Sequence, residues 1–186
     1  MNEKIDRRAK MTKNFLKNSL IELMKKKSIF SVTVKEVCEN ADVNRSTFYK
    51  HYKSVGDLYE EILNDITEDV SYIVKCSEKE GTLYSSRFVE SILNYVEKKK
   101  DIFLVVLSDK GNTDFGEFVV RNTDKIIAGR EYSELSKYCV YFITAGMSSI
   151  IWKWLSDENR ASAHSLALLI SNLLNNGIKR AYLFSR

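Results

Sequence analysis

The sequence predicts an all-α protein. Its 186 residues include no proline and only seven glycines, so few residues in the chain would break a helix. Apolar residues recur at spacings of three and four, and the alternation of β-branched residues that marks strands is scarce. Hydrophobic residues make up 44% of the chain, which is enough for a sizeable core. We expect a three-helix N-terminal domain over residues 1–53 and a larger helical domain over residues 54–186.

Positive charge is concentrated at the N-terminal end. Residues 1–53 hold 13 Lys and Arg against 6 Asp and Glu, whereas the remainder holds 16 against 19. A basic head on a mildly acidic body favours a nucleic-acid partner for the head. A solvated, lysine-rich helix would give the same composition, so charge alone leaves both interpretations open.

The first helix is expected from about Asp6 to Lys27. Lysines crowd its last turn, where positive charge suits the helix dipole. Its apolar face is expected to hold Phe15, Leu16, Ser19, Leu20, Leu23 and Met24.

A second helix follows closely. Thr33 with Glu36 three residues later forms a capping box, the signature of a helix start. The free backbone N–H groups and the hydroxyl at this end could serve a phosphate. The expected apolar face of this helix is Val34, Val37, Cys38 and Ala41.

A third helix, of barely two turns, is expected after a turn through Asp42 and Val43. It begins at Asn44 or Arg45. Phe48 and Tyr52 are four residues apart, so they share a face and can pack on the first two helices. The residues that remain on the outside are Arg45, Ser46, Thr47, Tyr49 and Lys50.

Two short helices joined by a tight turn and braced by a longer one predict a helix-turn-helix. The second of them would present polar and cationic side chains to base edges and phosphates in the major groove of DNA. A helical hairpin with a solvated basic face is the alternative.

Residues 8–62 resemble the N-terminal domain of the TetR/AcrR family of bacterial transcriptional regulators. The matching stretches are "TVKEVC" from Thr33, "ADVNRSTFYKHY" from Ala41, and Asp57-Leu58. Asp42 departs from the glycine that is usual at the turn, although aspartate tolerates a left-handed backbone. Val55-Gly56 replaces the usual basic or polar start of the fourth helix, so Lys53 and Ser54 would have to supply the phosphate contact there.

The resemblance implies DNA contacts for residues of the second and third helices and the turn that follows. It implies phosphate contacts from Thr33, Tyr49, His51 and Lys53, and base contacts from Arg45, Ser46, Thr47 and Lys50; Asn44 completes the expected DNA-binding set. Arg45 is the strongest candidate for a base contact, because a guanidinium can pair bidentately with guanine. A phosphate clamp is the alternative for Arg45, and a cap on its own helix is the alternative for His51.

The body is expected to begin with a fourth helix, capped by Ser54 and Asp57 and reaching about Lys75. Its apolar stripe is Leu58, Ile62, Ile66, Val70 and Ile73. Further helices are expected over residues 82–100, 101–108 and 115–128, followed by two that carry apolar residues on two faces.

Helices that are apolar on two faces need two partners. We therefore expect a homodimer through the last two helices, a four-helix bundle across a two-fold axis. The expected interface is Ile150, Trp152, Leu155, Leu166, Ile170, Leu173 and Leu174. A thicker monomer core is the alternative.

The resemblance implies a repressor that reads a palindromic operator and is released by a small molecule bound in the body. An aromatic pocket would favour a hydrophobic or planar ligand. The aromatic residues expected to line it are Phe88, Tyr95, Phe103, Phe115, Phe118, Tyr138 and Phe142. Ordinary core packing is the alternative for each ring. A regulator or coactivator controlled by a protein partner is the second functional hypothesis.

Other classes of protein fit poorly. The chain has no catalytic motif, so an enzyme is not expected. Three widely spaced cysteines and two histidines predict reduced thiols in a cytoplasmic protein, with no metal or other cofactor. The apolar segment 138–155 contains Lys153 and is better explained as a buried helix than as a membrane span. A non-specific architectural binder would fit the charge but not the polar set on a capped helix.

Overall fold

The computed structural model of the protein describes residues 2–108 and 134–178, and within these ranges the chain is helical and contains no strand. The all-α fold class is confirmed. The elements are α1 (Asn2–Met24), the 3₁₀ turn η1 (Ile29–Ser31), α2 (Val34–Ala41), α3 (Arg45–Phe48), α4 (Val55–Lys79), α5 (Ser86–Lys98), α6 (Lys100–Val106), α9 (Glu134–Ser156), α10 (Ala163–Leu173) and the π-helical turn η3 (Leu174–Ile178).

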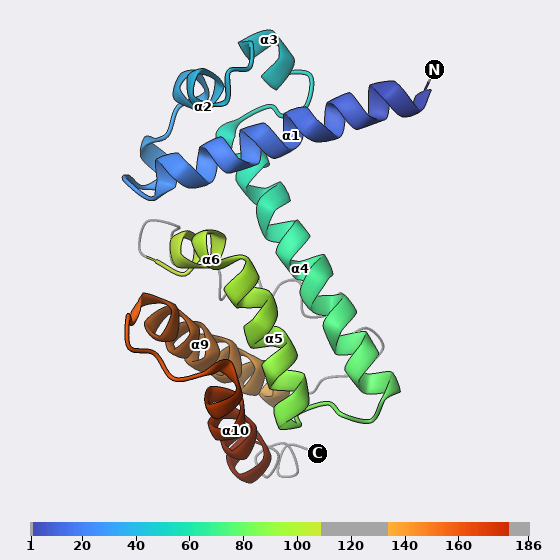
Figure 1. Ribbon diagram of the computed structural model, residues 1–186, viewed down its shortest axis with the longest axis vertical. Helices are drawn as coiled ribbons and strands as arrows, with labels where there is room; N and C mark the ends of the chain where they lie inside the picture. Colours follow the sequence, from blue (N-terminus) through green and yellow to red (C-terminus); the bar gives the residue numbers. More distant parts are fainter. Residues whose placement is uncertain (1, 109–133, 179–186) are drawn as a thin grey trace.

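The helices form a small head and a larger body that share α4 (Figure 1). In the head, α1 lies across the N-terminal end of α4, and α2 and α3 lie on the far side of α1 from the body. The long helix α4 then leads down into the body. There α10 packs along α5, and α6 contacts both α9 and the end of α1.

The core of the head is formed by buried residues of α1, α2 and α3. Leu16, Leu20 and Met24 of α1 are fully buried, as are Val37 of α2 and Phe48 of α3. Leu16, Leu20 and Met24 recur at helical spacing on one face of α1, as the sequence periodicity predicts. Phe15 was expected on this face and is instead half exposed, because it lies one position outside the narrow stripe that α2 and α4 cover.

A buried polar contact fixes α2 on α1. The Ser19 hydroxyl donates to the carbonyl oxygen of Val37 at 2.8 Å, and the Asn40 side-chain amide donates to the Ser19 oxygen at 3.1 Å. Because Ser19 is buried, each of these bonds satisfies a polar group that would otherwise be costly to desolvate. The contact therefore sets the rotation of α2 about its own axis.

Several helix ends differ from their expected positions. The first helix begins at Asn2 and ends at Met24, and α4 continues to Lys79, beyond the expected end at Lys75. The segment 82–100 is shorter as a helix than expected, since Ser85 caps α5 and Lys99 separates it from α6. The helix expected over residues 115–128 lies outside the described residues.

The third helix is a single turn, shorter than the two turns expected. Regular α-helix ends at Phe48, and hydrogen-bonded turns carry the chain on to Tyr52, whose N–H donates to the Phe48 carbonyl oxygen. Both rings are nevertheless buried and lie 5.6 Å apart between centroids, as the four-residue spacing predicts. A short helix can hold its position here because these two rings anchor it.

The start of α4 is capped as expected. The Ser54 oxygen accepts from the N–H of Asp57 at 3.1 Å, and the Asp57 carboxylate accepts from the N–H of Lys53 at 2.9 Å. Val55, the first residue of α4, is buried with the core of the head. The apolar core thus extends across the expected boundary between residues 53 and 54. The domain boundary at this position stays a prediction.

Ion pairs join α1 to α4. Lys13 and Lys17 of α1 lie 3.0 and 2.8 Å from the carboxylate of Glu61 on α4, and Lys17 also lies 2.6 Å from Asp65. Burial alone would raise the pKa of Glu61, but the hydrogen bonds from Lys17 and Lys13 outweigh burial and lower it. The folded state therefore favours the ionised carboxylate.

We expect the Glu61→Gln variant to lose about 1 kcal/mol of unfolding free energy at pH 7, because the two lysines lose their charged partner. A carboxyl group with a lowered folded pKa stabilises the fold above its ordinary pKa and loses that effect as the pH falls. The difference from wild type should therefore shrink below about pH 4.5. Urea unfolding at several pH values measures it.

The matched control for this experiment is Glu60→Gln, an exposed neighbour on the same helix that should unfold like the wild type. Equal losses in the two variants, or a difference that persists at pH 3, would contradict the role assigned to the ion pairs.

Candidate nucleic-acid interface

The N-terminal end of α2 is closed by its own capping box. The Thr33 oxygen accepts from the N–H of Glu36 at 3.3 Å, and the Glu36 carboxylate accepts from the Thr33 N–H and hydroxyl. Lys27 pairs with the same carboxylate at 2.6 Å. These hydrogen bonds, from Lys27 first and then from Thr33, lower the pKa of Glu36 to about 2.

The capping box is therefore confirmed, but the Thr33 hydroxyl is not free for a phosphate as expected. It is committed to Glu36, and an ionised carboxylate lies at the helix end that was expected to attract an anion. A phosphate contact at Thr33 stays a prediction.

The turn between α2 and α3 depends on Asp42. Its backbone is left-handed, with φ 52° and ψ 45°, a conformation that favours glycine and that Asp adopts more readily than most residues. Two residues on, the Asn44 side chain accepts from the N–H of Ser46 at 2.8 Å and caps α3. Arg45 is therefore the first residue of α3, at the end from which a recognition helix reads base edges.

The expected DNA-binding residues are mostly accessible. Exposed side chains are those of Thr33, Asn44, Arg45, Ser46, Tyr49, Lys50 and Lys53, while those of Thr47 and His51 are half-buried. The Tyr49 ring is 59% exposed and meets Phe48 edge-to-face at 5.6 Å. Within this short segment, buried rings alternate with exposed polar groups. The buried rings hold α3 and the turn after it in place, so their cations and hydrogen-bonding groups face outward from fixed positions.

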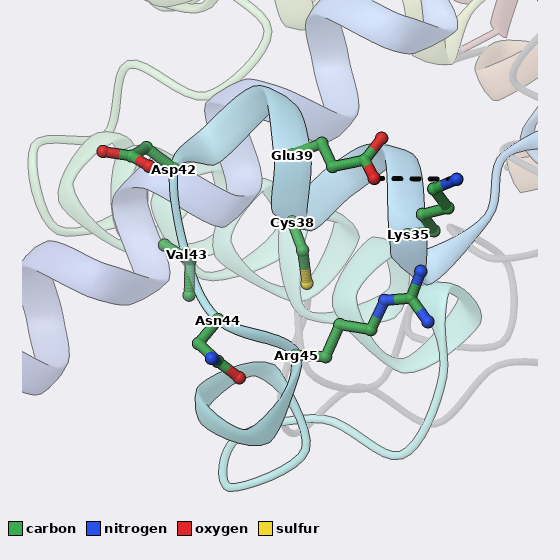
Figure 2. Close-up of a pocket in the computed structure, with 7 residues that line it drawn as sticks. All are labelled: Lys35, Cys38, Glu39, Asp42, Val43, Asn44 and Arg45. Atoms are coloured by element: carbon green, nitrogen blue, oxygen red, sulfur yellow. Dashed lines mark ion pairs between the residues drawn. The ribbon is translucent and has the colours of Figure 1, made fainter.

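A hollow of about 550 Å³ lies between α2 and the start of α3 (Figure 2). Arg45 lines it together with Lys35 and Glu39 of α2. Lys35 and Glu39 are not part of the set predicted from the sequence. Their four-residue spacing places them on one polar flank of α2, but only the folded chain shows that this flank adjoins Arg45.

Cys38 lies at the floor of this hollow (Figure 2). Burial raises the pKa of its thiol, and the positive charge of Arg45 opposes the rise only in part. Cys38 is therefore a neutral thiol at physiological pH and acts as a small apolar residue.

Two family models match the chain. One, described as "Bacterial regulatory proteins, tetR family", matches residues 19–62, and the other, "Transcriptional regulator C-terminal region", matches residues 84–176. The first covers most of the head, including α2, α3 and the start of α4. The chain belongs to the TetR family. It is a DNA-binding transcriptional regulator with a helix-turn-helix.

Three solved structures of transcriptional regulators have a similar fold. The TetR transcriptional regulator from Streptococcus agalactiae 2603V aligns with a TM-score of 0.65 and 20% identity, over 94% of this chain and 99% of that one. The fatty acid degradation regulator FadR from Bacillus halodurans gives 0.63 and 11%, over 89% and 95%. The dihydroxyacetone kinase operon activator DhaS gives 0.55 and 19%, over 91% and 97%.

The rings expected to line a pocket in this TetR regulator do not all come together. Phe103 is buried and meets Tyr95 edge-to-face at 5.8 Å, and Phe88 is half-buried beside the same core. Tyr138 and Phe142 of α9 are instead 74% and 70% exposed, and within residues 2–108 and 134–178 they do not pack with Tyr95 and Phe103. Phe115 and Phe118 lie outside the described residues.

The predicted dimer interface also needs correction. Leu155, Leu166, Ile170 and Leu174 are buried within the chain itself, where α9 and α10 contribute to the core. Periodicity could not distinguish the two apolar faces of these helices, and the inner face was included in the interface. Among the expected residues, Trp152 and Leu173 are exposed and Ile150 is partly exposed.

None of the described helices is long and apolar enough to cross a membrane. Within residues 2–108 and 134–178, no group of three His, Cys, Asp or Glu side chains is placed to hold a metal ion.

We expect Arg45→Ala to weaken DNA binding most at one base position, by about 1–3 kcal/mol per half-site, because one guanidinium contacts one base. Dissociation constants for a set of singly substituted operators measure the effect. A uniform loss on every operator would reassign Arg45 to the phosphate backbone.

Lys53→Ala should instead lower affinity on all DNA sequences alike. An exposed lysine that neutralises one phosphate contributes about one unit to the slope of log affinity against log salt. Titrations at several salt concentrations give this slope for variant and wild type. An unchanged slope would show that Lys53 contacts no phosphate.

Proposed function

We propose that this TetR regulator is a cytoplasmic homodimeric repressor that binds a near-palindromic operator and is released by a small hydrophobic or aromatic ligand. The observation that carries the proposal is the exposed polar set on α3, held in place by the buried rings of Phe48 and Tyr52. Groups that read bases must be fixed in position, and this arrangement fixes them.

An exposed apolar surface on α9 and α10 supports the dimer. Large apolar side chains are at least 40% exposed there: Tyr138, Tyr141, Phe142, Trp152, Leu168, Leu169 and Leu173. A surface of this kind on a single chain marks an interaction site. A second copy of the chain, packed on this surface about a two-fold axis, would place two α3 helices for half-sites roughly 35 Å apart.

Contacts between the body and the head support control by a ligand. The Tyr95 hydroxyl on α5 donates to Asp69 on α4 at 2.9 Å, and the Tyr95 ring packs on Phe103 of α6. At the other side of α6, Asp101 pairs with Lys25, the residue directly after α1, at 2.8 Å. A ligand that separated these rings would shift α6 against α4, and the shift would reach α1 through Asp101.

Control by a protein partner is the second candidate. The exposed rings of Tyr138 and Phe142 favour it, because exposed aromatic side chains suit a protein surface better than an enclosed ligand site. Among the proteins of similar fold, DhaS is an operon activator. In this alternative the DNA-binding surface is the same, and the output is activation.

Selection of bound sequences from a random DNA pool, at near-physiological salt, tests the core of the proposal. A recovered palindrome with half-sites about one helical turn apart supports a sequence-specific dimer. Recovery of no motif, with binding that disappears as salt rises, would mean that the head grips only the DNA backbone.

Replacing Leu173, which is 54% exposed on α10, by Glu should convert the dimer into a monomer, because a charge would be buried at the interface. Operator affinity should fall at least tenfold, since a monomer engages one half-site only. Sedimentation velocity gives the mass, and fluorescence anisotropy gives the affinity.

The control is Tyr72→Glu on α4, which also places a charge at an exposed apolar position. It should leave the mass and the affinity unchanged. A Leu173→Glu protein that remains dimeric would place the interface elsewhere.

A further inference from the structure

The two exposed flanks of α2 face different neighbours. On one flank, Glu36 pairs with Lys27 and the Asn40 amide reaches Ser19, so this side is turned toward α1. On the other flank, Lys35 and Glu39 line the hollow that Arg45 closes from α3. The buried contacts of α2 with α1 hold this orientation, so the second flank adjoins the end of α3 that reads DNA.

The carboxylate of Glu39 is available to a ligand, unlike others in the head. Those of Glu36 and Asp57 accept hydrogen bonds from backbone N–H groups of their own caps. Glu39 is 3.8 Å from Lys35, beyond hydrogen-bond distance, and both side chains are more than 60% exposed. Asp42 also lines the hollow, but its carboxylate points away from Arg45 (Figure 2).

A carboxylate at a DNA-binding surface opposes binding unless it finds a hydrogen-bond donor. Phosphates repel it, and guanine O6 and N7 and thymine O4 are acceptors that also repel it. Cytosine offers its N4 amino group at the edge of the major groove, and Glu is a characteristic partner for it. An Arg and a Glu in one hollow can therefore read a guanine and, in the neighbouring base pair, a cytosine.

We propose that Glu39 is a specificity-determining residue, which selects cytosine in the base pair next to the one whose guanine Arg45 reads. Lys35 lies beside it and reduces the electrostatic cost of bringing a carboxylate near phosphates. The inference rests on the proposed reading of the major groove by α3, and it adds α2 to the surface that reads sequence.

Two variants of the full-length protein test this inference. Sequence selection is repeated with Glu39→Gln and Glu39→Ala, and with Glu68→Gln as a control that removes one exposed negative charge from α4. Affinities are then measured for the preferred operator and for one in which the selected cytosine is replaced by thymine in both half-sites. Thermal unfolding shows whether each variant is folded, as expected for an exposed position.

The wild type and the Glu68→Gln control should bind the thymine operator at least tenfold more weakly per half-site than the cytosine operator. Glu39→Gln should discriminate less than about threefold, since an amide both donates and accepts. Glu39→Ala should behave likewise, and both variants should keep the preferences at all other positions.

The outcomes separate this inference from the function on which it rests. An unchanged base preference in both variants, or an equal gain in affinity on every sequence, would reduce Glu39 to a repelling charge and overturn the inference. A wild-type protein that selects no motif would overturn the inference and the proposed function together.

Discussion

The contact between α1 and α4 determines where the recognition helix lies relative to the body. Lys13 and Lys17 reach across to Glu61, while the Tyr52 ring is buried with Lys13 above it at 5.5 Å. Burial, and next the negative charge of Glu61, raise the pKa of Tyr52, so its phenol stays neutral. Tyr52 closes the turn after α3, and Lys13 contacts both the Tyr52 ring and Glu61. The ion pairs and the position of the recognition helix are therefore coupled.

A second contact gives α1 a second support. Lys25, the residue directly after α1, pairs with Asp101 of α6, and α1 itself contacts both α4 and α6. Because α1 is held by both α4 and α6, a movement of α6 relative to α4 would rotate α1. In a dimer, such a rotation would change the separation of the two α3 helices, which DNA of fixed helical repeat does not tolerate.

Features set by neighbouring residues could be predicted from the sequence. The caps at Thr33 and Ser54, and the tolerance of Asp42 for the turn, follow from side chains bonding to nearby backbone. Long-range packing could not. The rotation of α2 depends on Ser19, 21 residues before Asn40, and nothing local shows that Glu39 faces α3. The inner face of α10 is likewise as apolar as its outer face, so burial of Ile170 and exposure of Leu173 required the folded chain.

The basic character of the head reflects both how few acids it has and how those acids are held. Glu36, Asp57 and Glu61 are each held by backbone N–H groups or lysines within the fold, which places their negative charge in local hydrogen bonds. Arg45 on α3 and Lys50 in the turn after it remain exposed. Attraction to phosphates then needs no large net charge, since the fold pairs the acids and leaves these cations facing outward. Glu39 is held only by a 3.8 Å ion pair with Lys35 and accepts no cap hydrogen bond, so its charge costs binding energy on most sequences, and a base that donates to it recovers that cost.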